Sequence, residues 1–148
     1  LKQMEAEYFM ISPELDQFNH REFFDHLSEF MKREDFNSYT TWDSVGVMID
    51  PQRLAKKEYL DYTHFYSRIE DVTQAQTVFL KPKGLYLVAY HRGSYDTTYQ
   101  TYNRMIEFAK QNNLEFLGYS YEEFILDEIS VIGYDNYLTQ IQIQVQLK

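Results

Sequence analysis

The sequence predicts an α+β fold built from two βαββ-type repeats related by a pseudo-twofold axis, with antiparallel sheets enclosing a central ligand groove. Three observations support this prediction. Stretches typical of strands make up most of the chain, only two stretches have helical spacing, and the order strand, helix, strand, strand occurs twice. The repeat is one of pattern order, not of sequence identity. The 148 residues suit a single domain over 1–148, with internal halves at about 8–70 and 77–148.

The elements of the first half are recognised by apolar spacing and by the prolines that interrupt it. Strands end at Ser12-Pro13 and at Asp50-Pro51, because proline cannot donate to a strand ladder. Between them, Phe23, Leu27 and Phe30 recur at helical spacing opposite a charged face. In order, we expect a helix-permissive lead-in at 1–7, a strand at 8–11, a helix from 19 or 20 to about 33, a strand at 44–49, a connection at 52–57, a strand at 58–66 and a polar loop at 69–76.

The second half repeats this order with one extra strand at its front. In order, we expect strands at 77–80 and 85–91, a helix from about 95 to 112, a strand that contains Glu123, a hairpin at 127–134 and a last strand at 136–147. The last strand is the clearest, because Ile141, Ile143 and Val145 alternate with glutamines and so form one buried face. We expect these glutamines to face solvent.

The composition favours a binding pocket over a nucleic-acid surface. Aromatic residues make up 18% of the chain, with 14 tyrosines and 11 phenylalanines, and tyrosine lines cavities as readily as it fills cores. The net charge of -9 lacks the basic excess that nucleic acid requires, and would instead attract cationic ligands. With no cysteine and no paired histidines, we predict no metal and no cofactor.

The sequence gives no sign of a membrane-spanning or exported chain. No apolar run approaches membrane-spanning length, and the start does not resemble a signal peptide. The absence of cysteine fits a reducing compartment, so we expect a cytoplasmic protein. Because the chain begins at Leu1 without Met, both a segment of a longer protein and a stand-alone protein are open interpretations.

One stretch, from Leu117 to Ile125, places carboxylates among aromatic side chains. Strand alternation puts Glu123 on one face with Tyr119 and Tyr121, and Glu122 on the other. A carboxylate in a row of large apolar side chains is costly unless something pairs with it. Two interpretations follow: a tyrosine-walled cavity with an acid at its base, or an edge strand whose Glu123 face is wet or caps nearby amides.

Three segments, at 85–95, 121–127 and 137–145, follow in order and spacing the layout of GyrI-like effector-binding domains, which the chain therefore resembles most clearly from 77 onward. Such domains form the ligand-binding part of BmrR-like multidrug-sensing transcription regulators of the MerR type. The resemblance implies a pocket for bulky, often cationic aromatic compounds. It also implies a buried glutamate that faces the positive charge of the ligand, which falls on Glu123, with Glu122 as the adjacent competitor.

The resemblance also implies further ligand-binding residues. Pocket aromatics fall on Tyr39, Tyr62 and Tyr137, and a second acid falls on Asp135. One pocket tyrosine of the family falls near Thr98, and either Tyr95 or Tyr99 could replace it. Trp42 lies near Tyr39 in the sequence and is one more candidate for the pocket wall. For each aromatic residue the alternative is ordinary packing.

Three functions compete at this point. The first is a small-molecule sensor, the effector-binding part of a transcription regulator whose DNA-binding domain lies outside this chain. The second is a hydrolase of electrophilic small molecules that uses a pocket glutamate as base; we place it below the sensor, because the sequence shows no nucleophile–base pair. The third is a gyrase-inhibitor-type protein binder, in which the acidic surface would be the active feature. Of the three we predict the sensor.

Overall fold

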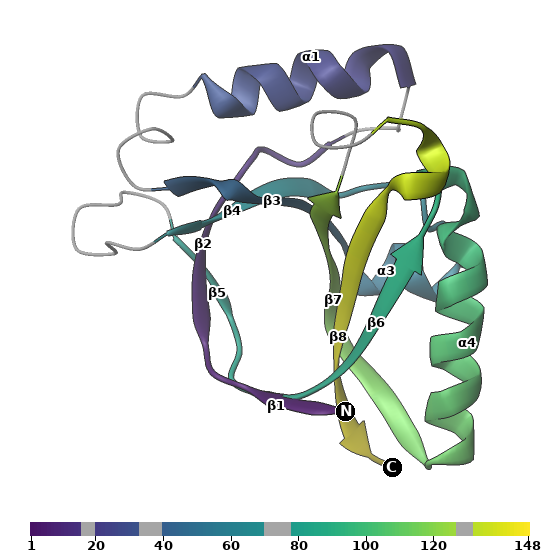
Figure 1. Ribbon diagram of the computed structural model, residues 1–148. Helices are drawn as coiled ribbons and strands as arrows, with labels where there is room; N and C mark the ends of the chain where they lie inside the picture. Colours follow the sequence, from purple (N-terminus) through teal and green to yellow (C-terminus); the bar gives the residue numbers. More distant parts are fainter. Residues whose placement is uncertain (16–19, 33–39, 70–77, 127–131) are drawn as a thin grey trace.

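The computed structural model describes residues 1–15, 20–32, 40–69, 78–126 and 132–148 (Figure 1). For residues 20–24, 40–44, 126 and 134 it describes the backbone alone. Its elements are β1 (Lys2–Met4), β2 (Glu7–Ile11), α1 (His20–Met31), β3 (Thr40–Ile49), α3 (Pro51–Ala55), β4 (His64–Ile69), β5 (Phe79–Lys81), β6 (Gly84–Arg92), the 3-10 helix η1 (Tyr95–Thr97), α4 (Thr98–Gln111), β7 (Leu114–Leu126), the 3-10 helix η2 (Tyr134–Asn136) and β8 (Leu138–Leu147). The predicted α+β class is confirmed.

The described strands form one antiparallel sheet in the order β1-β6-β8-β7-β3-β4-β2-β5. The first strands after the two long helices, β3 and β7, pair in the centre of the sheet, where Val47 lies opposite Glu122. The extra strand predicted at the front of the second half, β5, pairs with β2 of the first half. The order is of the same kind from both ends. Each side has an edge strand (β1 or β5), the strand before a helix (β6 or β2), the second strand after that helix (β8 or β4) and the first strand after it (β7 or β3). The two halves are thus joined edge to edge in one sheet, and the predicted boundary between them at 70–77 lies outside the described residues.

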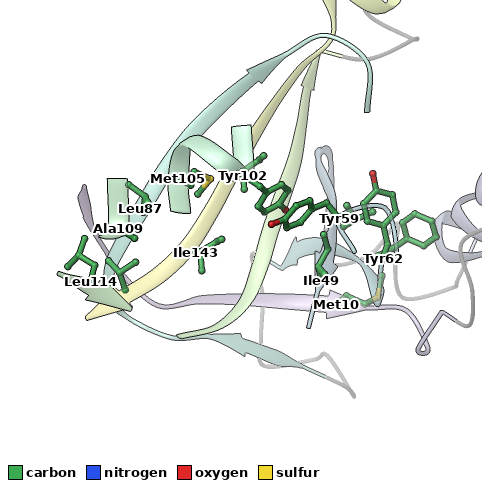
Figure 2. Packing of buried hydrophobic residues seen from close by; sticks show 14 of the residues in the cluster. Met10, Ile49, Tyr59, Tyr62, Leu87, Tyr102, Met105, Ala109, Leu114 and Ile143 are labelled. Atoms are coloured by element: carbon green, nitrogen blue, oxygen red, sulfur yellow. The ribbon is translucent and has the colours of Figure 1, made fainter. Parts of the chain in front are cut away.

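The sheet curls into an incomplete barrel, with α1 and α4 outside it (Figure 1). Alternate residues of each strand therefore face either the helices or the interior of the curl. The helix-facing core joins Val47 and Ile141 of the sheet to Tyr102 and Met105 of α4. Part of this core is shown in Figure 2. The interior of the curl holds a second, mostly aromatic cluster, which consists of Phe9, Met48, Tyr66, Tyr86 and Tyr121.

The segment at 58–63, predicted as part of a strand, is not one, because β4 begins only at His64. The predicted connection before it contains the short helix α3, which starts with Pro51 and is capped by the Asp50 carboxylate accepting from the Arg53 amide at 2.8 Å. The Arg53 guanidinium donates to the carbonyl of Tyr62 at 2.9 Å and pairs with Asp61 at 3.3 Å. These bonds hold the segment in an irregular path instead of in the sheet.

Two further predictions, at the two ends of the chain, were wrong. The lead-in contains the strand β1, which pairs with β6, rather than a helix. The glutamines of the last strand do not all face solvent, since Gln142 is 5% exposed. Its amide oxygen accepts a hydrogen bond from the buried Lys81 ammonium, which also pairs with Glu7 at 3.2 Å and lies 4.6 Å from the ring centre of Tyr86. The curl of the sheet encloses a face that a flat sheet would leave wet.

Candidate ligand-binding site

The centre of the candidate site is Glu122, in the middle of β7. It pairs with Val47 of β3 on one side and with Ile141 of β8 on the other, so its backbone is central in the sheet. β3 approaches closely here because residue 46 is glycine: a Cβ at Gly46 would collide with the carbonyl oxygen of Glu122 and with the ring of Tyr66. The two halves of the fold are therefore pressed together where the carboxylate lies.

The Glu122 side chain is fully buried on the face that α4 covers. Its Oε2 accepts a hydrogen bond of 2.6 Å from the Tyr102 hydroxyl, which also lies 2.7 Å from Ser120 Oγ. Its Oε1 is buried and has no hydrogen-bond partner among the described residues. A buried carboxylate with one unpartnered oxygen costs free energy of folding, so a functional reason for it is expected.

The buried position changes the acidity of Glu122. Burial raises the pKa of its carboxyl group from the ordinary 4.5 to about 7, because the charged form loses hydration. The hydrogen bond from Tyr102 acts in the opposite direction on this pKa, since it favours the carboxylate, but it is the smaller effect. Near neutral pH the group can therefore be present both as a neutral acid and as an anion.

Aromatic side chains gather on the same face of β7. The Tyr95 ring of η1 lies 5.4 Å from the ring of Phe124 and 5.3 Å from that of Tyr137, measured between centroids. Tyr62 is buried, and its pKa is raised well above 10 by burial and, next, by the negative charge of Glu122, with Tyr95 also contributing. The structure thus brings together one acid and three of the predicted tyrosines from separate segments of the chain.

The backbone explains how these segments meet. Gly93, in the turn after β6, donates its amide to the carbonyl of Tyr137 at 2.9 Å, which ties the start of β8 to the loop that leads into η1. In that loop Ser94 caps η1, and the buried His91 ring contacts the hydroxyl of Thr101 on α4 at 2.8 Å. The α4 N-terminus and the Tyr95 ring are therefore held over the end of β7.

Comparison with known proteins assigns this arrangement to a family. A family model described as a GyrI-like small molecule binding domain matches residues 15–146. The chain belongs to the GyrI-like family. The family resemblance predicted from the sequence is confirmed.

Two kinds of relative accompany this match. The chain is 29% identical over 143 residues to a multidrug-efflux transporter 2 regulator of Bacillus subtilis (strain 168), an alignment that covers 97% of this chain and 52% of the regulator. The GyrI-like domain thus spans about half the length of that relative. In structure it is similar to the C-terminal domain of EcmrR, with a TM-score of 0.72 at 15% identity over 99% of this chain and 96% of that one. It is also similar to EcmrR in a DNA complex, with a TM-score of 0.68 at 15% identity over 99% of this chain and 56% of that one.

Glu123, the acid that the sequence favoured, lies on the opposite face of the GyrI-like sheet from Tyr62, Tyr95 and Tyr137. Its carboxylate lies 3.9 Å from the Arg68 guanidinium. Its charge raises the pKa of Tyr66, in the aromatic cluster inside the curl, after the larger effect of burial. Of the tyrosines predicted for the pocket, Tyr62 therefore lies near the adjacent acid, Glu122, and Tyr95 and Tyr137 pack together on the same side of β7.

The other predicted residues of the GyrI-like pocket have different positions. Asp135 is exposed on η2, two residues before the buried Tyr137. Thr98, near which the resemblance placed a pocket tyrosine, is buried at the start of α4, and Tyr95 supplies the ring that lies beside Tyr137. Tyr39 and the side chain of Trp42 lie outside the described part of the chain.

Two residues of the site were not singled out from the sequence. The Tyr102 hydroxyl donates to the carboxylate of Glu122, Ser120 is hydrogen-bonded to that same hydroxyl, and both residues are buried. A signal existed for each, since Ser120 shares the strand face of Glu122 and Tyr102 lies on the apolar side of the predicted helix. The contact between the Tyr102 hydroxyl of α4 and the Glu122 carboxylate of β7, however, depends on how the helix packs on the sheet. The spacing of residues along the sequence does not reveal it.

Two other features, a metal centre and a membrane-spanning helix, are absent from the described part of the chain. Among the described residues, no three His, Asp or Glu side chains gather as a metal site requires. None of the helices in the described ranges is both long and apolar enough to cross a membrane.

Proposed function

We propose that this GyrI-like domain binds bulky aromatic cations against Glu122, and that it is the sensor part of a cytoplasmic transcription regulator. The observation that supports the proposal best is the buried Glu122 carboxylate, whose Oε1 has no hydrogen-bond partner among the described residues. Tyr62 lies near this carboxylate, whose charge raises the pKa of the Tyr62 hydroxyl after the larger effect of burial. A cationic ligand would supply the missing partner. Tyr95 and Tyr137 would then form part of the wall.

The proposed chemistry follows from the kinds of side chain present. A delocalised organic cation has little hydration to lose, and each tyrosine face attracts it by about 0.5–2 kcal/mol. One buried carboxylate supplies the opposite charge without demanding a fixed hydrogen-bond geometry. Aromatic walls accept many planar shapes, which suits a sensor of broad specificity. Tyr39, Trp42 and Asp135 remain predicted members of this site.

The role as a sensor rests on the relatives. The similar Bacillus subtilis protein is named as a regulator of a multidrug-efflux transporter, and it is about twice as long as this chain. We propose that the DNA-binding part of the present regulator likewise lies outside the 148 residues, and that this domain itself makes no contact with nucleic acid, in keeping with its net charge of -9.

The test compares aromatic cations with neutral compounds of the same shape. Tetraphenylphosphonium and tetraphenylmethane derivatives would be titrated by calorimetry into the wild type, Glu122→Gln and Glu123→Gln. We expect the wild type and Glu123→Gln to prefer the cation, and Glu122→Gln to lose that preference by at least about tenfold in Kd. The matched control is strong because the two acids are neighbours on opposite faces of one strand.

The pH dependence of binding provides a second readout. Cation binding favours the ionised carboxylate, so wild-type affinity should rise as the pH passes from about 6 to 8, while the Glu122→Gln variant should show no such rise. If Glu123→Gln lost the cation preference and Glu122→Gln kept it, the ligand would lie on the other face of the sheet. If neither variant differed from wild type, the acid-based site would be wrong.

One observation also favours a second candidate, hydrolysis of electrophilic small molecules. A carboxylate with a pKa of about 7 and one unpartnered oxygen is suited to act as a general base at neutral pH. Product formation from a strained electrophile such as an epoxide, abolished in Glu122→Gln, would support this candidate; binding without turnover would support the sensor.

A further inference from the structure

A cavity lies on the helix side of the sheet, apart from the Glu122 carboxylate. It has a volume of about 230 Å³ and is enclosed by α3, α4, β7 and β8. Its lining residues are Pro51, Leu54, Ala55, Tyr59, Tyr102, Ile106, Phe116, Gly118 and Ile143. Tyr59, Tyr102 and Ile143 are buried and form its floor, whereas Ala55 and Gly118 are exposed and mark its mouth. The cavity therefore opens to solvent on one side.

Gly118 lies at the mouth of the cavity and has an unusual backbone conformation. Its φ of +70° lies in the left-handed region, and it falls at the irregularity where β7 shifts register against β8. A Cβ placed on it would meet no atom within 4 Å, so the space beside this backbone is empty. A residue with a side chain would be strained by this backbone conformation.

Tyr102 separates the cavity from the acid. Its ring lines the cavity and stacks on the Tyr59 ring, as Figure 2 shows. The two ring centroids are 4.2 Å apart and the planes are 3° from parallel. The Tyr102 hydroxyl reaches the other way to Glu122, which does not line the cavity.

We infer that this cavity is a second binding site, which takes a neutral compound of one or two aromatic rings. No charged side chain lines it, so a charged ligand would be buried without a partner. The rings of Tyr59, Tyr102 and Phe116 favour stacking or edge contacts with a flat ligand. The volume is below the roughly 300–1,000 Å³ of pockets for drug-sized ligands, and apolar cavities of about 150 Å³ already accept benzene.

The probe for the test is 2-naphthol, which is neutral below pH 8 and has two rings and one hydroxyl. It would be titrated by calorimetry into the wild type, into Ala55→Trp, which places an indole at the mouth, and into Gln52→Trp. Gln52 is exposed on the same short helix but does not line the cavity, so it controls for an added tryptophan on α3. Ile106→Trp closes the cavity from α4 and serves if Ala55→Trp distorts α3. Circular dichroism would establish that each variant is folded.

We expect 2-naphthol to bind the wild type, Gln52→Trp and Glu122→Gln alike, and to bind Ala55→Trp and Ile106→Trp at least about tenfold more weakly. Failure to bind the wild type, or equal binding to both closed variants, would overturn the proposal. Loss of binding in Glu122→Gln alone would also overturn it, because the probe would then occupy the acid site. Cation binding at Glu122 is measured separately, so either site can fail without the other.

Discussion

Replacing Glu122 by glutamine should make the ligand-free protein more stable at alkaline pH. The carboxyl is fully buried with a pKa raised to about 7 from an ordinary 4.5, so the folded protein holds its proton more tightly than the unfolded chain does. Stability associated with the protonated acid is therefore fully present below about pH 4.5 and is lost as the pH rises through about 7. Glutamine is neutral at every pH and escapes this loss.

The size of the effect follows from the difference between the two pKa values. Since one pKa unit corresponds to about 1.4 kcal/mol, Glu122→Gln should gain on the order of 3 kcal/mol in free energy of unfolding at about pH 8.5. At about pH 5 the gain should fall below roughly 1 kcal/mol, because a neutral amide then replaces a mostly neutral acid. Urea unfolding followed by circular dichroism at several pH values would measure both.

The matched control for this prediction is Glu123→Gln. Glu123 lies beside Arg68, whose side chain is 41% exposed, so losing that pair should destabilise the protein by no more than about 1 kcal/mol, with no gain at high pH. The stability difference between wild type and Glu122→Gln is the deciding quantity, because other titrating groups cancel in it. A difference that stays constant from pH 5 to 8.5 would refute the burial of an ionisable Glu122.

The remaining predictions concern Tyr102, which donates to this carboxylate, and two glycines, Gly46 and Gly118. Tyr102→Phe removes the donor to Glu122, so it should cost about 1–3 kcal/mol more at pH 8.5 than at pH 5 in the same unfolding assay; equal losses at both pH values would contradict the hydrogen bond. Gly46→Ala places a methyl group against the Glu122 carbonyl and the Tyr66 ring, and should lower the free energy of unfolding by about 3 kcal/mol or more. Gly118→Ala, which meets only backbone strain, should lose about 1–2 kcal/mol, and a ranking of the two alanines in the reverse order would show that β3 and β7 are not closely packed.

Much of the fold could be predicted because periodicity reports local burial. The helices α1 and α4 and most strands lie close to their predicted positions, since each has one face against a core and the sequence alternates accordingly. The segment at 58–63 was an exception. In a strand Tyr59 and Tyr62 would lie on opposite faces, yet both side chains enter the core. The Arg53 guanidinium of α3 donates to the Tyr62 carbonyl, and this bond helps to keep the backbone out of the sheet.

The parity of β7 was determined by the sequence alone: Glu122 shares a face with Ser120 and Phe124, and Glu123 shares the other with Tyr119 and Tyr121. Which of the two faces meets α4 and the gathered tyrosines was decided only by the tertiary structure. Strand alternation shows only that successive side chains point to opposite faces of the sheet. It does not show which element covers each face. The curl of the sheet and the β3–β7 pairing set that choice, and they depend on contacts between residues far apart in the chain.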